Sequence, residues 1–513
     1  MLTIINKKNK YNPILTSSLI VAAITIMVKI LGYFEKIALA YYWGTSYVVD
    51  VYSVVAGIIL TVFVFFREII EPGFLNAFLK ASYLKDVPGR WVIFNFFFRL
   101  LLFVSLLLTA IVCFAPGMVI GVFAPGFSTE KKILAIKLIQ LVFPACIFLA
   151  SSALFNITLN ALKKFGLAAA GELAYKLSII ITLLISVKYL GIYAAITGLL
   201  IGSFSKFLVQ GGKLLKRLSF KRNHLDPAFL KTTWKLSWPL LIGVLFSQLG
   251  SLADNIYSSY MQEGAIASLS YAKKLIDFPL LICPYILSVI VFPYFAELAI
   301  ANETAKRKEL FYHSLAWLTL LFLPLSVYFY LCSYEVVSLV FKHGAFDEYS
   351  AQLTAAPLRY YAVGMVFFAL EMMLVVYYFA NADTRTPIIV GILCVCEHII
   401  LAFFLIKITG YSGIALAFTI AKATKTLILL FLLKDDFYAQ SGKISLFLLK
   451  IVTSGAAMGA GILLWKFLFY RNIQETALNH LLFLLIAFGL GLLIYCGSFI
   501  LLKGKLSTFI FKI

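Results

Sequence analysis

Apolar stretches of about 20 residues follow one another from Ile14 to Leu502, with short polar segments between them. An α-helix of this length crosses a hydrocarbon layer of roughly 30 Å. A membrane β-barrel would instead show short segments in which polar and apolar residues alternate. The pattern therefore predicts an all-α integral membrane protein with about fourteen transmembrane helices. We expect them over residues 14–42, 50–71, 91–114, 133–160, 167–187, 190–211, 235–259, 265–293, 311–332, 355–380, 386–408, 411–434, 445–467 and 478–502.

Composition and charge fix the orientation of these helices. Of the 513 residues, 62% are hydrophobic and 13% are charged, and the mean hydropathy is +0.97. The net charge of +21 comes mainly from Lys and Arg in every second connecting segment, such as 80–90, 213–231 and 306–308. Basic residues in short loops stay on the cytoplasmic side, so this bias predicts that both termini are cytoplasmic. It also accounts for the charge without a nucleic-acid partner.

Several features recur along the chain at nearly one separation. The recurring pairs are Gly44 and Gly264, which end helices, Phe123 and Phe341, which begin similar segments, and Asn160 and Asn381, which close helices. This regularity predicts two parallel six-helix repeats plus two C-terminal helices, an arrangement found in transporters that rock one half against the other. The expected divisions are an N-terminal half over 1–212, a basic cytoplasmic linker over 213–234, a C-terminal half over 235–434 and two additional transmembrane helices within 435–513.

Ionisable residues inside the predicted helices are candidates for function. Each costs a few kcal/mol or more in lipid, so it should face protein or water. They concentrate in the first, second, seventh and eighth helices, the matching pairs of the two halves, where a cavity between the halves would lie. The candidates to line it are Lys29, Lys36, Asp50, Lys273, Lys274 and Asp277.

Other charged residues leave alternatives open. Lys273 or Lys274 with Asp277 has the spacing of a helical ion pair, which could simply lock helices together. Glu172 and Lys176, at positions i and i+4, fit either a structural pair or a transport pathway. The sequence offers no explanation for Lys422 and Lys425. In the seventh helix, Asp254 lies on a polar stripe with Ser247, Ser251 and Ser258.

The seven cysteines are scattered and imply no disulfide framework. The segment Cys394-Val-Cys396-Glu397-His398 could suggest a metal site. Successive helix positions point in different directions, however, so ordinary core packing is the better interpretation.

A set of motifs in order along about 360 residues carries a family resemblance. The motifs are Lys29-Ile-Leu-Gly32, Trp43-Gly-Thr-Ser with Asp50, Glu71-Pro-Gly-Phe74, Ala124-Pro-Gly-Phe127, Tyr271-Ala-Lys-Lys-Leu-Ile-Asp-Phe-Pro279 with Phe292-Pro293, Phe341-Lys-His-Gly-Ala-Phe-Asp347, and Phe379-Ala-Asn-Ala-Asp-Thr-Arg-Thr-Pro387. With these motifs the chain resembles the MurJ/MviN family of lipid II flippases, within the multidrug/oligosaccharidyl-lipid/polysaccharide exporter superfamily.

The resemblance implies a flippase in a bacterial inner membrane that moves an undecaprenyl-pyrophosphate-linked peptidoglycan precursor to the outer leaflet. Cationic side chains would receive the pyrophosphate, and Lys29, Lys36, Lys273 and Lys274 could supply that charge. Asp50 and Asp277 match acidic residues of the family. Two departures leave the substrate open to another polyprenyl-linked oligosaccharide, of O-antigen or capsule type. Glu35-Lys36 reverses the usual order of charges, and lysine replaces arginine elsewhere.

The source of energy follows from what the sequence lacks and from the resemblance. No G-x-x-x-x-G-K-[ST] motif is present, so we expect no ATP hydrolysis by this chain. Some members of the family hold a sodium ion between the seventh and eleventh helices, which makes Asp254 and Glu397 the candidate ion-coupling residues. Coupling to sodium, to protons or to the membrane potential is expected, with no other cofactor.

Two other function classes compete with a flippase. A membrane-embedded glycan polymerase would place an acid/base set in an extracytoplasmic loop, but the largest such loops, Ala115–Lys132 and Ser333–Thr354, hold none. A cation or drug antiporter would favour acidic cavity helices, whereas lysines are in excess here. We therefore expect no enzyme. The expected partners are a lipid-linked oligosaccharide substrate, membrane lipids and cell-wall synthesis proteins.

Overall fold

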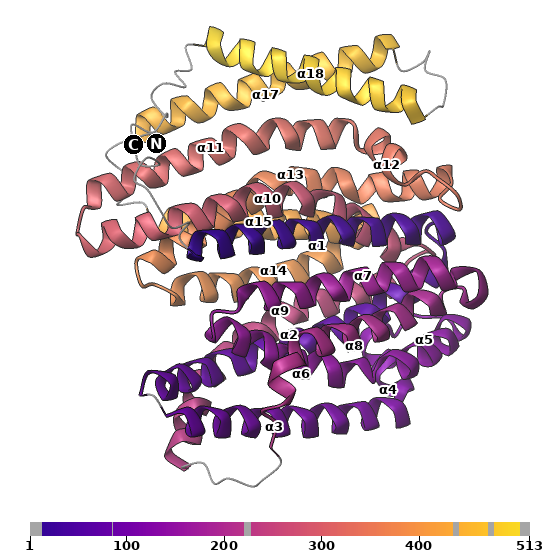
Figure 1. Ribbon diagram of the computed structural model, residues 1–513. Helices are drawn as coiled ribbons and strands as arrows, with labels where there is room; N and C mark the ends of the chain where they lie inside the picture. The colour runs from indigo at the N-terminus through magenta and orange to yellow at the C-terminus, as the bar shows by residue number, and fades with distance from the viewer. Residues whose placement is uncertain (1–12, 85, 220–226, 434–440, 470–476, 503–513) are drawn as a thin grey trace. The chain divides into compact units, whose positions relative to one another are not determined.

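The computed structural model describes residues 13–84, 86–219, 227–433, 441–469 and 477–502, and in these ranges every regular element is a helix (Figure 1). The prediction of an all-α protein is confirmed. The helices divide into two compact units, in which unit 1 comprises Met1–Ala38 and Val51–Gln248 and unit 2 comprises Leu39–Asp50 and Leu249–Ile513.

Each unit is a bundle of long helices. Unit 1 holds most of α1 (Pro13–Trp43) and α2 (Tyr47–Tyr83), then α3 (Val87–Phe114), α4 (Pro116–Phe123), α5 (Thr129–Val142), α6 (Ala145–Ala161), α7 (Phe165–Leu190) and α8 (Tyr193–Leu215). Unit 2 holds the end of α9 (Pro227–Ser259), then α10 (Ala265–Ile300), α11 (Thr304–Leu331), α12 (Ser333–Phe341), α13 (Glu348–Ala380), α14 (Arg385–Thr409), α15 (Ser412–Leu432), α17 (Ser441–Phe469) and α18 (Ala477–Leu501). Unit 2 also includes the turn between α1 and α2.

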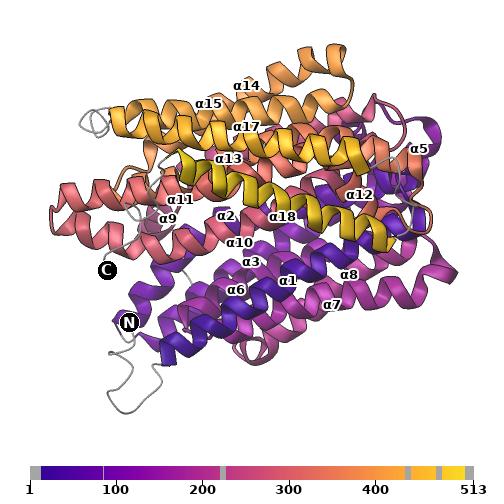
Figure 2. The same cartoon turned by 90° about the horizontal axis from the view of Figure 1, so that it is seen from above.

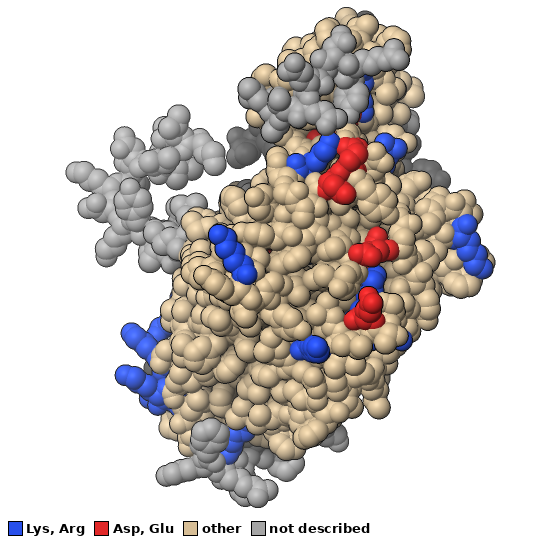
Figure 3. All heavy atoms as spheres, turned by 90° about the vertical axis from the view of Figure 1, so that its right-hand side faces the viewer, with Lys and Arg blue, Asp and Glu red and all other residues tan. Residues whose placement is uncertain are grey.

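The lengths and surfaces of the helices fit a bilayer. Among the described residues, ten helices are long and apolar enough to cross a membrane, and the bent pair α5–α6 adds one span. Helices α1, α9 and α10 have 31, 33 and 36 residues, more than the roughly 20 needed for a crossing. Adding these three helices to the eleven spans gives the predicted number of about fourteen. Large apolar side chains such as Phe103, Ile185 and Leu493 are 66%, 70% and 71% exposed. Figure 3 looks onto the side at which the helices of Figure 1 end and turn, and Lys, Arg, Asp and Glu side chains lie scattered there among other residues.

The predicted single helix over 133–160 is wrong in one respect. It consists of α5 and α6, which meet at a bend of 48°. Pro144 lies at this break, immediately before α6. Proline lacks a backbone N–H and its ring clashes with the preceding turn, so a helix kinks or ends there. The two predicted outer loops also contain short helices, α4 and α12.

The internal repeat extends to the backbone conformation. Six of the eight described residues with positive φ occur in pairs at almost the same separation along the chain, namely Gly44 and Gly264, Lys163 and Ala382, and Gly191 and Gly410. Each pair stands in equivalent turns, so the two halves share one succession of helices and turns, although Gly264 caps the start of α10 and does not end α9 as predicted. The domain boundaries predicted at 212, 235 and 434 stay a prediction.

The most closely packed helices of unit 1, α7 and α8, meet through small residues. In α8, Gly198 and Gly202 lie against α7, where an added Cβ would come within 3.0 Å of the Ile179 carbonyl oxygen and 2.8 Å of the Tyr175 carbonyl oxygen. The equivalent positions of α15 are Ala417 and Ala421, both buried. Small residues one turn apart let membrane helices approach closely, because dispersion contacts replace the hydrophobic effect within lipid.

The last two helices form a pair at the edge of unit 2. In both views α17 and α18 lie side by side, and α17 packs on α11 (Figures 1 and 2). Lys466 of α17 makes an ion pair with Glu335 of α12, with 2.7 Å between Nζ and Oε1. The two additional C-terminal helices that the sequence predicts are therefore present and anchored.

Candidate functional site

A buried carboxylate links three helices in unit 1. Glu35 of α1 accepts a hydrogen bond from Lys176 of α7, with 2.6 Å between Oε2 and Nζ. Its other oxygen accepts a bond from the Tyr52 hydroxyl of α2 at 3.1 Å. Lys176 therefore pairs across helices rather than with Glu172 one turn away. The lysine after Glu35, Lys36, is half-buried.

Glu172 has a partner of its own, which the sequence analysis missed. Lys206 of α8 is buried, and its Nζ lies 2.7 Å from Glu172 Oε1. The same ammonium group lies 4.5 Å from the ring centroid of Phe63 and 5.7 Å from that of Tyr175. An ion pair and two aromatic faces together compensate a charge that lipid would not tolerate.

Lys29, the first predicted substrate-binding residue, is half-buried on α1. No ion pair is seen for it among the described residues. Lys29 and Lys36 belong to unit 1, whereas Lys273, Lys274 and Asp277 belong to unit 2. Their predicted convergence on one substrate stays a prediction.

In unit 2, the acid of the polar stripe meets a histidine. Asp254 Oδ1 of α9 lies 2.7 Å from Nε2 of His398, which is buried on α14. The other ring nitrogen of His398, Nδ1, is buried and has no hydrogen-bond partner among the described residues. The ring also packs edge-on against Phe418 at 6.2 Å. A carboxylate and an imidazole in contact can hold or release one proton between them.

Glu397, the second predicted ion-coupling residue, does not share this contact. Its Oε1 accepts a hydrogen bond from the Thr424 hydroxyl of α15 at 2.8 Å. The nearby thiols point apart, since Cys394 is buried and Cys396 is exposed. In the described part of the chain, no group of three or more His, Cys, Asp or Glu side chains could hold a metal ion.

Asp50 stabilises the start of a helix. Its two oxygens accept hydrogen bonds from the backbone N–H groups of Gly264 at 2.8 Å and Ala267 at 2.9 Å, at the N-terminus of α10. Asp50 is 1% exposed, so in this conformation its carboxylate cannot reach a substrate. We therefore assign it a structural role here, and its predicted role in substrate binding stays a prediction.

The segment around Asp50 docks within unit 2 through tight turns. The Tyr271 hydroxyl donates to the Gly44 carbonyl oxygen at 3.1 Å, and Thr45 and Ser350 share a hydrogen bond of 2.9 Å. Gly44 and Gly264 both have positive φ, and a Cβ added to Gly264 would clash with the Thr45 carbonyl oxygen. Only glycine fits this backbone at no cost.

One of the predicted lysines of α10 lies against an aromatic ring. Lys273 places its Nζ 4.9 Å from the ring centroid of Phe418. Lys274 and Asp277 are half-buried on the same helix. Both lysines are thus half-buried within unit 2, and their predicted place in a cavity between the halves stays a prediction.

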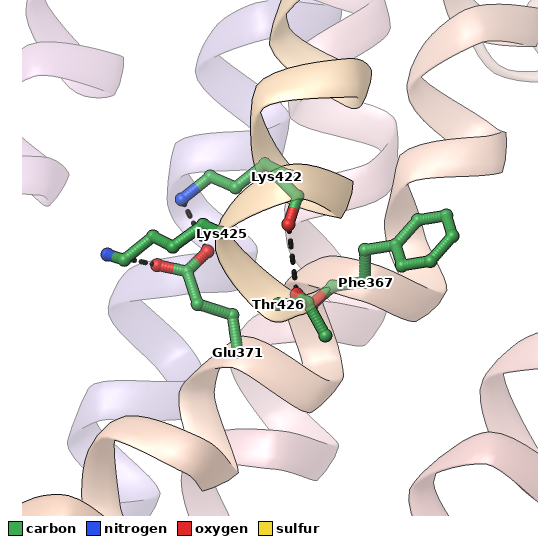
Figure 4. Close-up of polar contacts among 5 residues, drawn as sticks. All are labelled: Phe367, Glu371, Lys422, Lys425 and Thr426. Atoms are coloured by element: carbon green, nitrogen blue, oxygen red, sulfur yellow. Dashed lines mark hydrogen bonds and ion pairs between the residues drawn. The ribbon is translucent and has the colours of Figure 1, made fainter. Parts of the chain in front are cut away.

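Phe418 also faces a cluster that the sequence left unexplained. Lys422 and Lys425 of α15 both pair with Glu371 of α13, at 2.7 Å to Oε2 and 2.6 Å to Oε1 (Figure 4). Lys422 Nζ lies 5.5 Å from the Phe418 centroid. We call Lys273, Lys422, Lys425 and Glu371 the α15 lysine cluster. The internal repeat holds a signal that could have found it, because Lys425 is the repeat equivalent of Lys206.

Long, repeated membrane-crossing helices with paired charges inside each unit are typical of transporters. A family model described as lipid II flippase MurJ matches residues 39–486. The chain belongs to this family. A probable lipid II flippase MurJ of Buchnera aphidicola subsp. Schizaphis graminum is 26% identical over 423 residues, which cover 80% of this chain and 81% of that protein.

Solved structures share the fold. A lipid II flippase MurJ in an inward closed conformation aligns with a TM-score of 0.78 and 24% identity over 94% of this chain and 98% of that one. A multidrug resistance MATE family transporter of the MOP superfamily, in an inward-facing conformation, aligns with a TM-score of 0.70 and 12% identity over 83% of this chain and 99% of that one. The family expected from the sequence motifs is confirmed.

Proposed function

We propose that this protein moves lipid II, an undecaprenyl-pyrophosphate-linked peptidoglycan precursor, from the cytoplasmic to the outer leaflet by alternating access. The family match over residues 39–486 carries the proposal. Lysines held inside an otherwise apolar bundle add a physical reason, because a diphosphate can leave water only where cationic groups replace its hydration. In this proposal Lys29, Lys36, Lys273 and Lys274 receive the diphosphate, and Asp277 orients the lysines of α10.

Transport against a gradient needs a coupled ion, and we assign that step to Asp254 with His398. Their contact joins α9 to α14, so a change of its charge would alter how these helices pack. Glu397 lies on the same helix as His398 and is the second candidate. The chain is a transporter rather than an enzyme in this proposal. Both termini are cytoplasmic in a bacterial inner membrane, and cell-wall synthesis proteins are candidate partners.

Complementation tests the function directly. The gene should support growth of a strain depleted of its own lipid II flippase, and lipid II should then become accessible to a probe on the outer face. A strain that lacks an O-antigen or capsule flippase serves as the comparison. Rescue of that strain alone would show that the substrate is another polyprenyl-linked oligosaccharide.

A further inference from the structure

Two lysines occupy the same position in the two halves of the chain. Lys206 of α8 follows Gly191, and Lys425 of α15 follows Gly410, by the same number of positions. Both glycines have positive φ and stand in the turns that precede these helices. The turns fix the register, so the two lysines project from equivalent places. Their surroundings can therefore be compared position by position.

The partner of the first lysine is missing from the second half. Lys206 pairs with Glu172 of α7, whereas the repeat equivalent of Glu172 is Gly391 of α14. Lys425 Nζ lies 3.4 Å from the point where a Cβ on Gly391 would be. Lys425 turns instead to Glu371 of α13. The repeat has kept the lysine and moved its counter-ion to another helix.

The second half also has an additional lysine. Lys422 stands where the first half has Ser203, and it binds the same carboxylate as Lys425. In the described part of the chain, the ion pairs of both lysines go only to Glu371. Glu371 carries one negative charge against these two ammonium groups, and Lys273 lies against the same Phe418 ring as Lys422. A net charge in a membrane interior is costly unless an anion accompanies it.

The lysines of the two halves also differ in how accessible they are. The Lys206 side chain is 2% exposed, so its pair with Glu172 is closed. The Lys422 and Lys425 side chains are 22% and 17% exposed, although Glu371 is only 9% exposed. The side chains of Lys422 and Lys425 are therefore partly exposed, whereas that of Lys206 is enclosed.

We infer that the α15 lysine cluster is an oxyanion site inside unit 2 that binds phosphate-type groups. Lysines are compact cations that bind phosphate as point charges, and Glu371 holds the two ammonium groups in place without neutralising both. The bound group is a diphosphate, either free or on the head of a lipid-linked substrate. The lipid-linked source rests on the proposed function, and the site itself does not.

Binding to the full-length protein in nanodiscs tests the inference, with pyrophosphate and undecaprenyl diphosphate as the two probes. Lys422→Gln and Lys425→Gln should each weaken binding by about tenfold, because each removes one charge-assisted contact. Glu371→Gln should strengthen binding severalfold, because it removes the competing carboxylate. The repeat-matched control Lys206→Gln should leave binding unchanged. Lys425→Arg keeps the charge and should retain most of the affinity. A thermal unfolding scan shows whether Lys425→Gln is folded, and Lys425→Arg still tests the inference if it is not.

The outcomes separate the sources of the anion. Lysine-dependent binding of both probes supports a general diphosphate site, and lysine-dependent binding of undecaprenyl diphosphate alone supports a site for the lipid head. Affinities unchanged in both Lys→Gln variants, or weaker binding in Glu371→Gln, would overturn the inference. Failure of the wild-type gene to complement a flippase-depleted strain would count against the proposed function while leaving the measured site in place.

Discussion

Glu35 on α1 and Asp254 on α9 stand at equivalent positions of the two repeats, and each contacts a base on the fifth predicted helix of its own half. The base is Lys176 in the first half and His398 in the second. Both contacts join the first and fifth helices, but they differ in chemistry. The first contact pairs a carboxylate with an aliphatic ammonium group, and the second pairs a carboxylate with an imidazole, which acts as a proton shuttle in many proteins. The second half therefore carries the contact that a proton gradient could change.

The first prediction concerns this pair. Asp254→Asn keeps the shape of the side chain and removes its charge. We expect the variant to bind lipid substrate but to lose the dependence of transport on an imposed proton or sodium gradient. His398→Lys, which copies the base of the first half, should make the pair permanently ionic and remove the response to a proton gradient. Transport into proteoliposomes with controlled internal and external pH and sodium measures both effects.

A matched control is available in the first half. Glu35→Gln should lower stability and leave the gradient dependence of the remaining transport intact. If Asp254→Asn transports with unchanged gradient dependence, Asp254 is a structural hydrogen-bonding residue and coupling takes place elsewhere.

The sequence predicts some of these features and could not predict others. Hydropathy finds the helices because each must bury its own backbone hydrogen bonds in lipid. The spacing of Gly44 and Gly264 finds the repeat because only glycine readily adopts the left-handed turns there. The sequence cannot tell that Lys176 bonds to Glu35 rather than to Glu172, because the contact with Glu35 depends on how α1 packs against α7. For the same reason the sequence could not identify the partner of Lys422 and Lys425. That partner, Glu371, lies on α13, which is separated from α15 by a whole helix along the chain.

The second prediction tests the structural role of Asp50. Asp50→Ala removes both acceptors for the backbone N–H groups at the start of α10, and those groups are buried. We expect a loss of about 2 kcal/mol in the free energy of unfolding. Asp347→Ala is the control, because Asp347 caps α13 through one bond to the Ser350 N–H and is exposed, so its loss should be about half as large. Equal thermal shifts in detergent would contradict the assignment, as would loss of substrate binding by a fully stable Asp50→Ala protein.

The third prediction concerns the buried lysine of unit 1. Glu172→Gln leaves the Lys206 ammonium buried without its counter-ion. Breaking a fully buried pair costs roughly 3–5 kcal/mol, and we expect roughly 2 kcal/mol here because solvent screens a carboxylate that is 38% exposed. The double variant Glu172→Gln/Lys206→Met removes both charges and should recover most of the stability. A double-mutant cycle of thermal unfolding in detergent measures the coupling, and additive losses would show that the pair contributes nothing.

The fourth prediction concerns the turn between α1 and α2, which packs within unit 2. Alternating access by rocking halves requires this turn to leave α13 during each cycle. Gly44 and Gly264 are poor sites for cysteine because both have positive φ and lie against backbone atoms. Thr45 and Ser350 are better, since their hydroxyl oxygens are 2.9 Å apart and buried.

In Thr45→Cys/Ser350→Cys, an oxidant should form a disulfide and stop lipid II transport, and a reductant should restore it. Each single cysteine variant controls for the substitution alone. If transport continues undiminished in the cross-linked protein, the turn stays docked throughout the cycle and opening takes place at another part of the bundle.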